Sequence, residues 1–406
     1  MAQSPASWRV QGQALKAKGQ AALALAAFER AAGQEPTAAD LQDEIGFLLA
    51  VLGRQSEAIP RFEEAIRLQA AYAPAHYHLG VARWLRQEAD RAILAMREAV
   101  RLDARNAEYR FRLGSMLHEV ARDDEALVES TAALKLKPLR ADAWNLVGLI
   151  HQNRGDRVAA RGAFQKAVDL APKELDYRNN LGLALVETGA AGPGMAQFRK
   201  MLEQDPRQRR AQVNIGFAQL QAGDYDAAVT QFRKLIAEDP LQALVHYDLG
   251  LALKQKDQLD EAKRALEEAL RLDPDMVEAY YTLGITAWQN GDFDAAAAAM
   301  RQAVARRPAY AEAHYMLGTT LKQKGELGEA ARALEEAIRL NPETPGPFNT
   351  LAQIRQQQGD RESAQRLFAR AAAVKKKLEA EQAKRLGAMG PGSSGVAAMP
   401  GVRVRR

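Results

Sequence analysis

The chain contains no cysteine, and only 6 % of its 406 residues are aromatic. The lack of cysteine excludes disulfide bonds, thiolate metal sites and a cysteine nucleophile. No apolar run reaches the roughly 18 residues that a membrane span requires, so we expect no transmembrane helix. The sequence also lacks a phosphate-binding loop, metal-ligand spacing and a Ser-His-Asp grouping. We therefore expect no enzymatic activity, no cofactor and no metal site.

Most of the chain also carries almost no net charge. The formal net charge is +5, and residues 374–406 alone carry eight Lys or Arg and two Glu, a net +6. Residues 1–373 therefore carry a net −1. A surface that binds nucleic acid needs a strongly basic lining, so we expect no nucleic acid in a groove of this part of the chain.

Glycine recurs with a fixed spacing of 34 residues, at Gly12, Gly46, Gly80, Gly114, Gly148, Gly182, Gly216, Gly250, Gly284 and Gly318. A fixed period of this length indicates one supersecondary unit that is repeated along the chain. We number the positions of each repeat from 1 to 34, which places these glycines at position 8. The predicted array of eleven repeats covers 5–378, with the windows 5–38, 39–72, 73–106, 107–140, 141–174, 175–208, 209–242, 243–276, 277–310, 311–344 and 345–378.

Other positions of the repeat are also restricted. Position 20 is Ala in ten repeats, position 24 is large and apolar in ten, and position 32 is Pro in eight. Positions 4, 7, 8 and 11 lie on one helical stripe and positions 20, 24 and 27 on another, so each repeat is predicted to contain two amphipathic helices. Gly at position 15 in eight repeats marks the turn between them. The pattern predicts an all-α fold.

These positions resemble those of the tetratricopeptide repeat, with its Trp, Leu-Gly, Tyr, Ala, Phe and Pro columns. In the fifth repeat the matching residues are Trp144, Val147, Gly148, Gly155, Ala160, Phe164, Ala167 and Pro172. The resemblance covers residues 5–378. It implies a right-handed α-solenoid superhelix whose concave groove is lined by the first helix of each repeat.

Two regions depart from the pattern. The sixth repeat has Gly194 in place of the position-20 Ala, and residues 189–194 are rich in Gly where other repeats start a helix. We expect its second helix to be frayed or delayed, and leave open whether it is a functional hinge. The third and fourth repeats have Gln87 and Ala121 in place of the turn Gly and lack the preceding Pro, which predicts a different local pitch.

The two ends of the chain carry different expectations. Residues 379–387 are predicted to form a polar capping helix, and residues 388–406, rich in Gly, Pro and Ser, to be disordered. The apolar segment 21–28 places Ala24 and Phe28 at repeat positions 20 and 24, so we interpret it as part of a repeat and not as a signal peptide. We expect a soluble protein. The compartment stays open between the cytoplasm and, if a signal peptide was removed, the periplasm or the exterior.

Positions 2, 5, 9 and 12 of each first helix are expected to face the groove. Aromatic residues gather there in two clusters, in repeats 3–4 and 8–10, and asparagines lie between them. Tyr and Trp are effective peptide anchors because they combine a large apolar area with few rotamers and a polar group. The predicted peptide-binding residues are Tyr77, Trp84, Phe111, Asn145, Asn179, Asn180, Asn214, Tyr247, Tyr281, Trp288 and Tyr315. The alternative is that the position-5 rings pack between repeats.

We therefore expect a non-enzymatic monomeric scaffold that binds a protein or peptide in its groove. The alternative is an accessory subunit of a bacterial envelope, secretion or enzyme assembly with a permanently bound partner. The chaperone-tail carboxylate clamp of the family needs Lys at position 5 and Asn at position 9, and no repeat has either. The sequence does not identify the partner.

Overall fold

A computed structural model describes residues 4–388 of the chain. In this range the chain forms 22 α-helices and no strand, which confirms the predicted all-α fold class. None of these helices is both long and apolar enough to cross a membrane.

Each of the eleven predicted windows contains two helices, which we call A and B. The A helices are α1 (Pro5–Ala17), α3 (Ala39–Val51), α5 (Ala73–Leu85), α7 (Ala107–Glu119), α9 (Ala141–Asn153), α11 (Leu175–Glu187), α13 (Arg209–Gln221), α15 (Ala243–Gln255), α17 (Val277–Gln289), α19 (Ala311–Gln323) and α21 (Pro345–Gln357). The B helices are α2 (Ala21–Gln34), α4 (Gln55–Leu68), α6 (Ala89–Leu102), α8 (Asp123–Leu136), α10 (Arg157–Leu170), α12 (Ala191–Gln204), α14 (Tyr225–Glu238), α16 (Leu259–Leu272), α18 (Phe293–Arg306), α20 (Leu327–Leu340) and α22 (Arg361–Ala388).

Close packing between the A and B helices explains the repeated glycines. A Cβ atom placed on Gly46 would lie 2.6 Å from the Phe62 ring, and one on Gly148 would lie 2.4 Å from the Phe164 ring. Both rings are almost completely buried. Position 8 therefore has to be small because the large position-24 side chain occupies the space beside it.

The turn between the A and B helices keeps one backbone conformation even where glycine is absent. The glycines at position 15 have φ between 71° and 85°. Gln87, Ala121 and Asp257 occupy the same position with φ of 62°, 59° and 58°. We predicted a different local pitch for the third and fourth repeats. Their turns have the same left-handed backbone conformation as the turns that contain glycine. Their non-glycine residues bear the strain of a left-handed conformation.

A recurrent hydrogen bond fixes the link between successive repeats. The side chain at position 4 donates to the carbonyl oxygen of position 32 in the preceding repeat. Examples are His76 to Ala70 at 2.9 Å and Trp144 to Pro138 at 2.8 Å. The same bond is formed by Arg110, Arg178, Gln212, His246 and His314. The link therefore persists where position 32 is Ala, because a backbone carbonyl is the acceptor.

The prediction of a delayed second helix in the sixth repeat is wrong. Helix α12 begins at Ala191, the same repeat position as the other B helices, and Gly194 N–H already donates to Ala190 at 3.0 Å. Pro193 is tolerated because it is the third residue of the helix, where the N–H groups have no intrahelical acceptor.

Only part of the predicted C-terminal segments lies within the described residues. Residues 379–387 form the end of α22 and not a separate helix. Of the predicted disordered tail, Ala388 is the last residue of α22, and residues 389–406 lie outside the described part of the chain.

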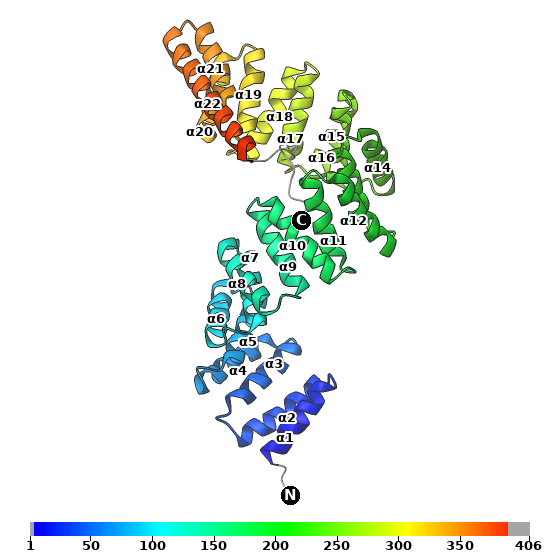
Figure 1. Ribbon diagram of the computed structural model, residues 1–406, viewed down its shortest axis with the longest axis vertical. Helices are drawn as coiled ribbons and strands as arrows, with labels where there is room; N and C mark the ends of the chain where they lie inside the picture. Colours follow the sequence, from blue (N-terminus) through cyan, green and yellow to red (C-terminus); the bar gives the residue numbers. More distant parts are fainter. Residues whose placement is uncertain (1–3, 389–406) are drawn as a thin grey trace. The chain divides into compact units, whose positions relative to one another are not determined.

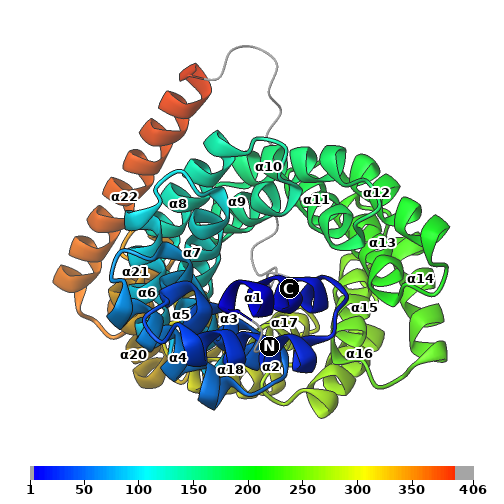
Figure 2. The same ribbon diagram turned by 90° about the horizontal axis from the view of Figure 1, so that it is seen from below.

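The chain divides into two compact units, which we call the N-terminal body (residues 1–184) and the C-terminal body (residues 185–406). The boundary, between residues 184 and 185, falls within α11, the helix labelled so in Figure 1. Successive A helices contact one another within each body, for example α7 with α9 and α15 with α17. In the C-terminal body, α13, α15 and α17 lie along the inner side of a curve and α14, α16 and α18 along its outer side (Figure 2).

Candidate functional site

We call the side chains at positions 2, 5, 9 and 12 of the A helices the A-helix face and describe it for each body separately. Six of the predicted binding residues belong to the N-terminal body, namely Tyr77, Trp84, Phe111, Asn145, Asn179 and Asn180. The other five, Asn214, Tyr247, Tyr281, Trp288 and Tyr315, belong to the C-terminal body.

In the N-terminal body the aromatic rings are covered by neighbouring side chains. Tyr77 stacks on Tyr109 with ring centroids 4.8 Å apart, and burial raises the pKa of Tyr77. The Arg140 guanidinium lies 3.9 Å from the centroid of the Phe111 ring, in a cation–π contact. Trp84 is half-buried and packs against the core formed by α6 and α7.

An ion-pair network holds this cluster together. Glu108 accepts hydrogen bonds from Arg112 at 2.7 Å and from Arg140 at 2.6 Å, and Arg140 also bonds Asp142 at 2.8 Å. Burial by itself would raise the pKa of Glu108, but the bonds from the two arginines outweigh it, and the pKa is lowered. The polar groups beside Phe111 are thus already satisfied by one another.

The asparagines between the two clusters are paired or buried. Asn180 donates through Nδ2 to Oδ1 of Asn145 at 2.9 Å, which joins position 6 of one repeat to position 5 of the preceding one. The side chains of Asn179 and Asn214 are each 3 % exposed. A peptide could therefore reach only Asn145 and Asn180, both half-buried. The sequence did not show this pairing directly. The signal for it was that Asn145 occupies position 5 of one repeat and Asn180 position 6 of the next.

In the C-terminal body the aromatic residues differ in exposure. Tyr247 is only 7 % exposed and packs in the core, whereas Tyr281, Trp288 and Tyr315 are half-buried. The Tyr281 ring lies 5.0 Å from the Tyr310 ring, and burial raises the pKa of both hydroxyls.

Tyr315 approaches the next A helix closely, since a Cβ on Gly346 would lie 2.7 Å from the Tyr315 hydroxyl oxygen. Of the four predicted rings in the C-terminal body, Tyr247 is thus part of the core. Accessible surface remains on Tyr281, Trp288 and Tyr315.

Two donors on the C-terminal face lack acceptors among the described residues. The indole Nε1 of Trp288 is buried and has no hydrogen-bond partner, although the ring makes an edge contact with Phe293. The Lys254 ammonium, at the same repeat position of α15, is half-buried and unpaired, and burial lowers its pKa. Sequence reasoning missed Lys254. Its position, shared with Trp84 and Trp288, was the available signal.

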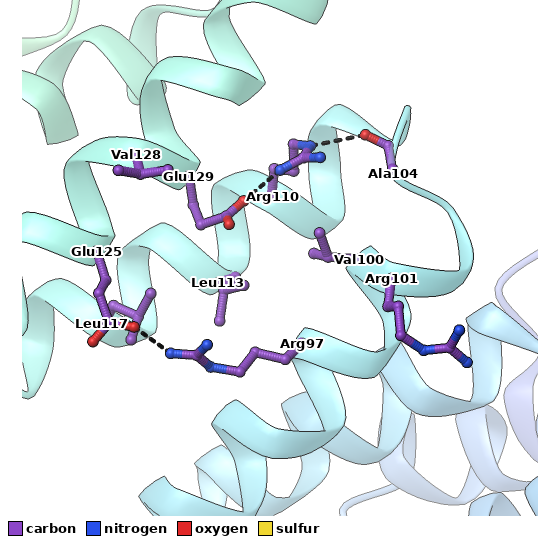
Figure 3. Close-up of a pocket in the computed structure, with 10 residues that line it drawn as sticks. All are labelled: Arg97, Val100, Arg101, Ala104, Arg110, Leu113, Leu117, Glu125, Val128 and Glu129. Carbon is purple, nitrogen blue, oxygen red and sulfur yellow. Dashed lines mark hydrogen bonds and ion pairs between the residues drawn. The ribbon is translucent and has the colours of Figure 1, made fainter.

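A cavity of about 420 Å³ opens between α6, α7 and α8 of the N-terminal body (Figure 3). Leu113 and Leu117 contribute apolar surface, and Arg110 pairs there with Glu129 at 2.7 Å. The cavity lies beside the fourth repeat, whose position 24 is the small, fully buried Ser130 in place of a large apolar residue. The remaining lining residues are Arg97, Val100, Arg101, Ala104, Glu125 and Val128.

The charges at this cavity are neutralised locally. Arg97 pairs with Glu125, and Arg101 forms bonds of 2.5 Å and 2.8 Å with Glu98 (Figure 3 shows the Arg97–Glu125 pair). No group of three or more His, Cys, Asp or Glu residues that could hold a metal occurs within residues 4–388.

Comparisons with known proteins agree with the repeat geometry. A family model described as tetratricopeptide repeat matches residues 44–107, 124–174, 151–209, 179–243, 213–277, 247–287 and 281–345. Together these segments cover more than half of the 406 residues. The search of curated proteins gave no match.

Solved structures with a similar fold include a tetratricopeptide repeat protein from Parabacteroides merdae, which is 16 % identical with a TM-score of 0.57 over 61 % of this chain and 98 % of that one. MamA from Desulfovibrio magneticus is 25 % identical over 42 % of this chain and 96 % of its own, with a TM-score of 0.40. Yeast Tom70 is 16 % identical over 95 % of this chain and 97 % of its own, with a TM-score of 0.48.

Proposed function

Because the chain belongs to the tetratricopeptide repeat family, we propose that it is a non-enzymatic scaffold that binds a protein or peptide along its A-helix face. Repeats of this kind present extended surfaces built from successive units, and the ligand is set by the side chains on that surface. We also propose that residues 5–378 form eleven such repeats.

The observation that carries the proposal is the row of half-buried aromatic residues on consecutive A helices of the C-terminal body. Tyr281 and Trp288 lie on α17 and Tyr315 on α19, and these two helices contact each other. Neighbouring side chains already restrict the rotamers of these rings in the free protein. Little further side-chain entropy is therefore lost when a peptide covers them. A partner would therefore gain apolar contact there at low cost.

The other predicted residues take different places in this proposal. Four of them lie in the N-terminal body and belong to internally bonded groups, namely Tyr77, Phe111, Asn145 and Asn180. They can line the A-helix face of that body without a free donor or acceptor being needed. Trp84 retains part of its surface and is the N-terminal candidate for a ligand contact.

The test is affinity capture from the native host, followed by mass spectrometry, with the wild type and three variants. Trp288→Ala and Trp84→Ala each remove one ring from the A-helix face. Leu241→Ala removes a side chain that is 71 % exposed in a link between repeats and serves as the matched control. Circular dichroism checks that every variant is folded.

We expect Trp288→Ala to reduce capture of specific partners by about tenfold, in the range of a binding hot spot. Leu241→Ala should leave capture unchanged. Equal recovery of the same proteins by all four chains would contradict binding on the A-helix face.

A further inference from the structure

Lys254 is an exception among the lysines near the ends of the A helices in the C-terminal body. Two residues further on, Lys256 pairs with Asp226 at 2.5 Å, and the equivalent Lys324 pairs with Asp294 at 2.8 Å and with Glu326 at 2.7 Å. Lys322, at the same repeat position as Lys254, donates to Gln353. Lys254 has no such partner among the described residues.

The neighbouring donor on the next A helix is also unsatisfied. Trp288 occupies position 12 of α17, as Lys254 does on α15, and the two helices contact each other. A buried donor without an acceptor costs about 1–3 kcal/mol, and an ammonium group withdrawn from water without a counter-charge is also unfavourable. Two such groups at one repeat position on adjacent helices mark a place where an acceptor is missing.

The acidic residues within α15 and α17 do not supply it. Glu278 on α17 bonds Arg307 at 2.7 Å, and Asp248 on α15 is 1 % exposed and has partners of its own. Neither acidic residue of these two helices therefore serves as the acceptor for Lys254 or for the Trp288 indole.

We propose that Lys254 binds a side-chain carboxylate of an acidic segment in the partner protein, with the half-buried Trp288 ring, at the same repeat position of the next A helix, as an apolar contact. This inference rests on the proposed protein-binding function and specifies the chemistry of the partner. One unpaired ammonium matches a single carboxylate. It does not match nucleic acid, which requires many neutralised phosphates and a basic surface.

The test uses a fluorescein-labelled peptide of alternating Glu and Leu and its counterpart with Gln in place of Glu. Fluorescence anisotropy is measured with the full-length wild type and with Lys254→Gln. Lys256→Gln, which alters a paired lysine on the same helix end, is the control. We expect the Glu peptide to bind the wild type at least tenfold more tightly than the Gln peptide. Lys254→Gln should remove this preference, and Lys256→Gln should keep it.

A second readout reports on Lys254 directly. NMR of the ¹³C-methylated lysines should show the Lys254 pKa rising on addition of the Glu peptide, because a bound carboxylate favours the charged ammonium. An unchanged Lys254 signal at peptide concentrations up to about 1 mM would overturn the proposal. A preference for Glu that survives in Lys254→Gln, or equal binding of a single-stranded oligonucleotide through Lys254, would also overturn it.

The outcomes separate this inference from the proposed function. If Trp288→Ala reduces partner capture but Lys254→Gln does not, the protein is a scaffold without the acidic-segment site. If neither variant changes capture, binding on the A-helix face of the C-terminal body is contradicted.

Discussion

The two aromatic clusters occupy the same repeat positions but have different surroundings. In the N-terminal body, Phe111 lies beneath Arg140, and Arg140 is bonded to Glu108 and Asp142. In the C-terminal body, Trp288 and Lys254 have donors without acceptors among the described residues. Similar rings in a similar register can thus belong to a satisfied structural network or to a surface that lacks a partner. The polar groups beside the rings decide between the two.

The largest expected difference between the two faces concerns stability. Arg140→Ala removes the cation–π contact with Phe111 and the bonds to Glu108 and Asp142, which should destabilise the N-terminal body by about 1–2 kcal/mol. Lys254→Ala removes no intramolecular bond and should change the C-terminal body by less than about 0.5 kcal/mol. Hydrogen exchange of the α7 and α15 amides measures both changes locally. Equal effects of the two variants would remove the contrast between the faces.

The unpaired indole N–H gives a smaller effect. Replacing Trp288 with 3-benzothienylalanine removes the N–H at nearly constant volume, so a buried unsatisfied donor disappears, and stability should rise by about 1 kcal/mol. The same replacement at Trp84, whose indole nitrogen is not buried without a partner, should change stability much less. Thermal unfolding followed by circular dichroism measures both. A loss of stability at Trp288 would show that its N–H is satisfied in solution.

The smallest gains in stability should come from relieving the strained turns, and they should be larger in the N-terminal body. Gln87→Gly and Ala121→Gly relieve a left-handed conformation and should each stabilise by about 0.5 kcal/mol. Asp257→Gly should gain less, because Asp tolerates this conformation better. Gly291→Ala, with φ of 77°, is the reverse control and should destabilise by about 1 kcal/mol. Thermal unfolding checks the order, and a destabilising Gln87→Gly would contradict the argument from strain.

Periodic side chains made most of the fold predictable. The Gly46–Phe62 and Gly148–Phe164 contacts follow from the position-8 and position-24 columns, because a helix pair can approach only where one side chain is small. The sixth repeat showed the limit of this reasoning. Composition alone suggested a delayed helix, whereas Pro193 lies in the first turn of α12, where proline is tolerated.

The candidate site was less predictable than the fold. The sequence located the aromatic positions, but it could not show that Tyr247 is buried or that Asn145 and Asn180 bond each other. It also gave no sign that Lys254 lacks a partner, because a partner comes from side chains of a neighbouring repeat and depends on how the repeats pack.

The sequence by itself determined the repeat length, the helix pairs, the place of the turns and the family to which the chain belongs. These properties depend on contacts within one repeat or between neighbouring repeats, and such contacts recur every 34 residues. Only the tertiary structure decided which rings on the A-helix face are covered and which donors are left without acceptors. That outcome depends on the particular side chains that adjacent helices bring together, and these differ from one repeat to the next.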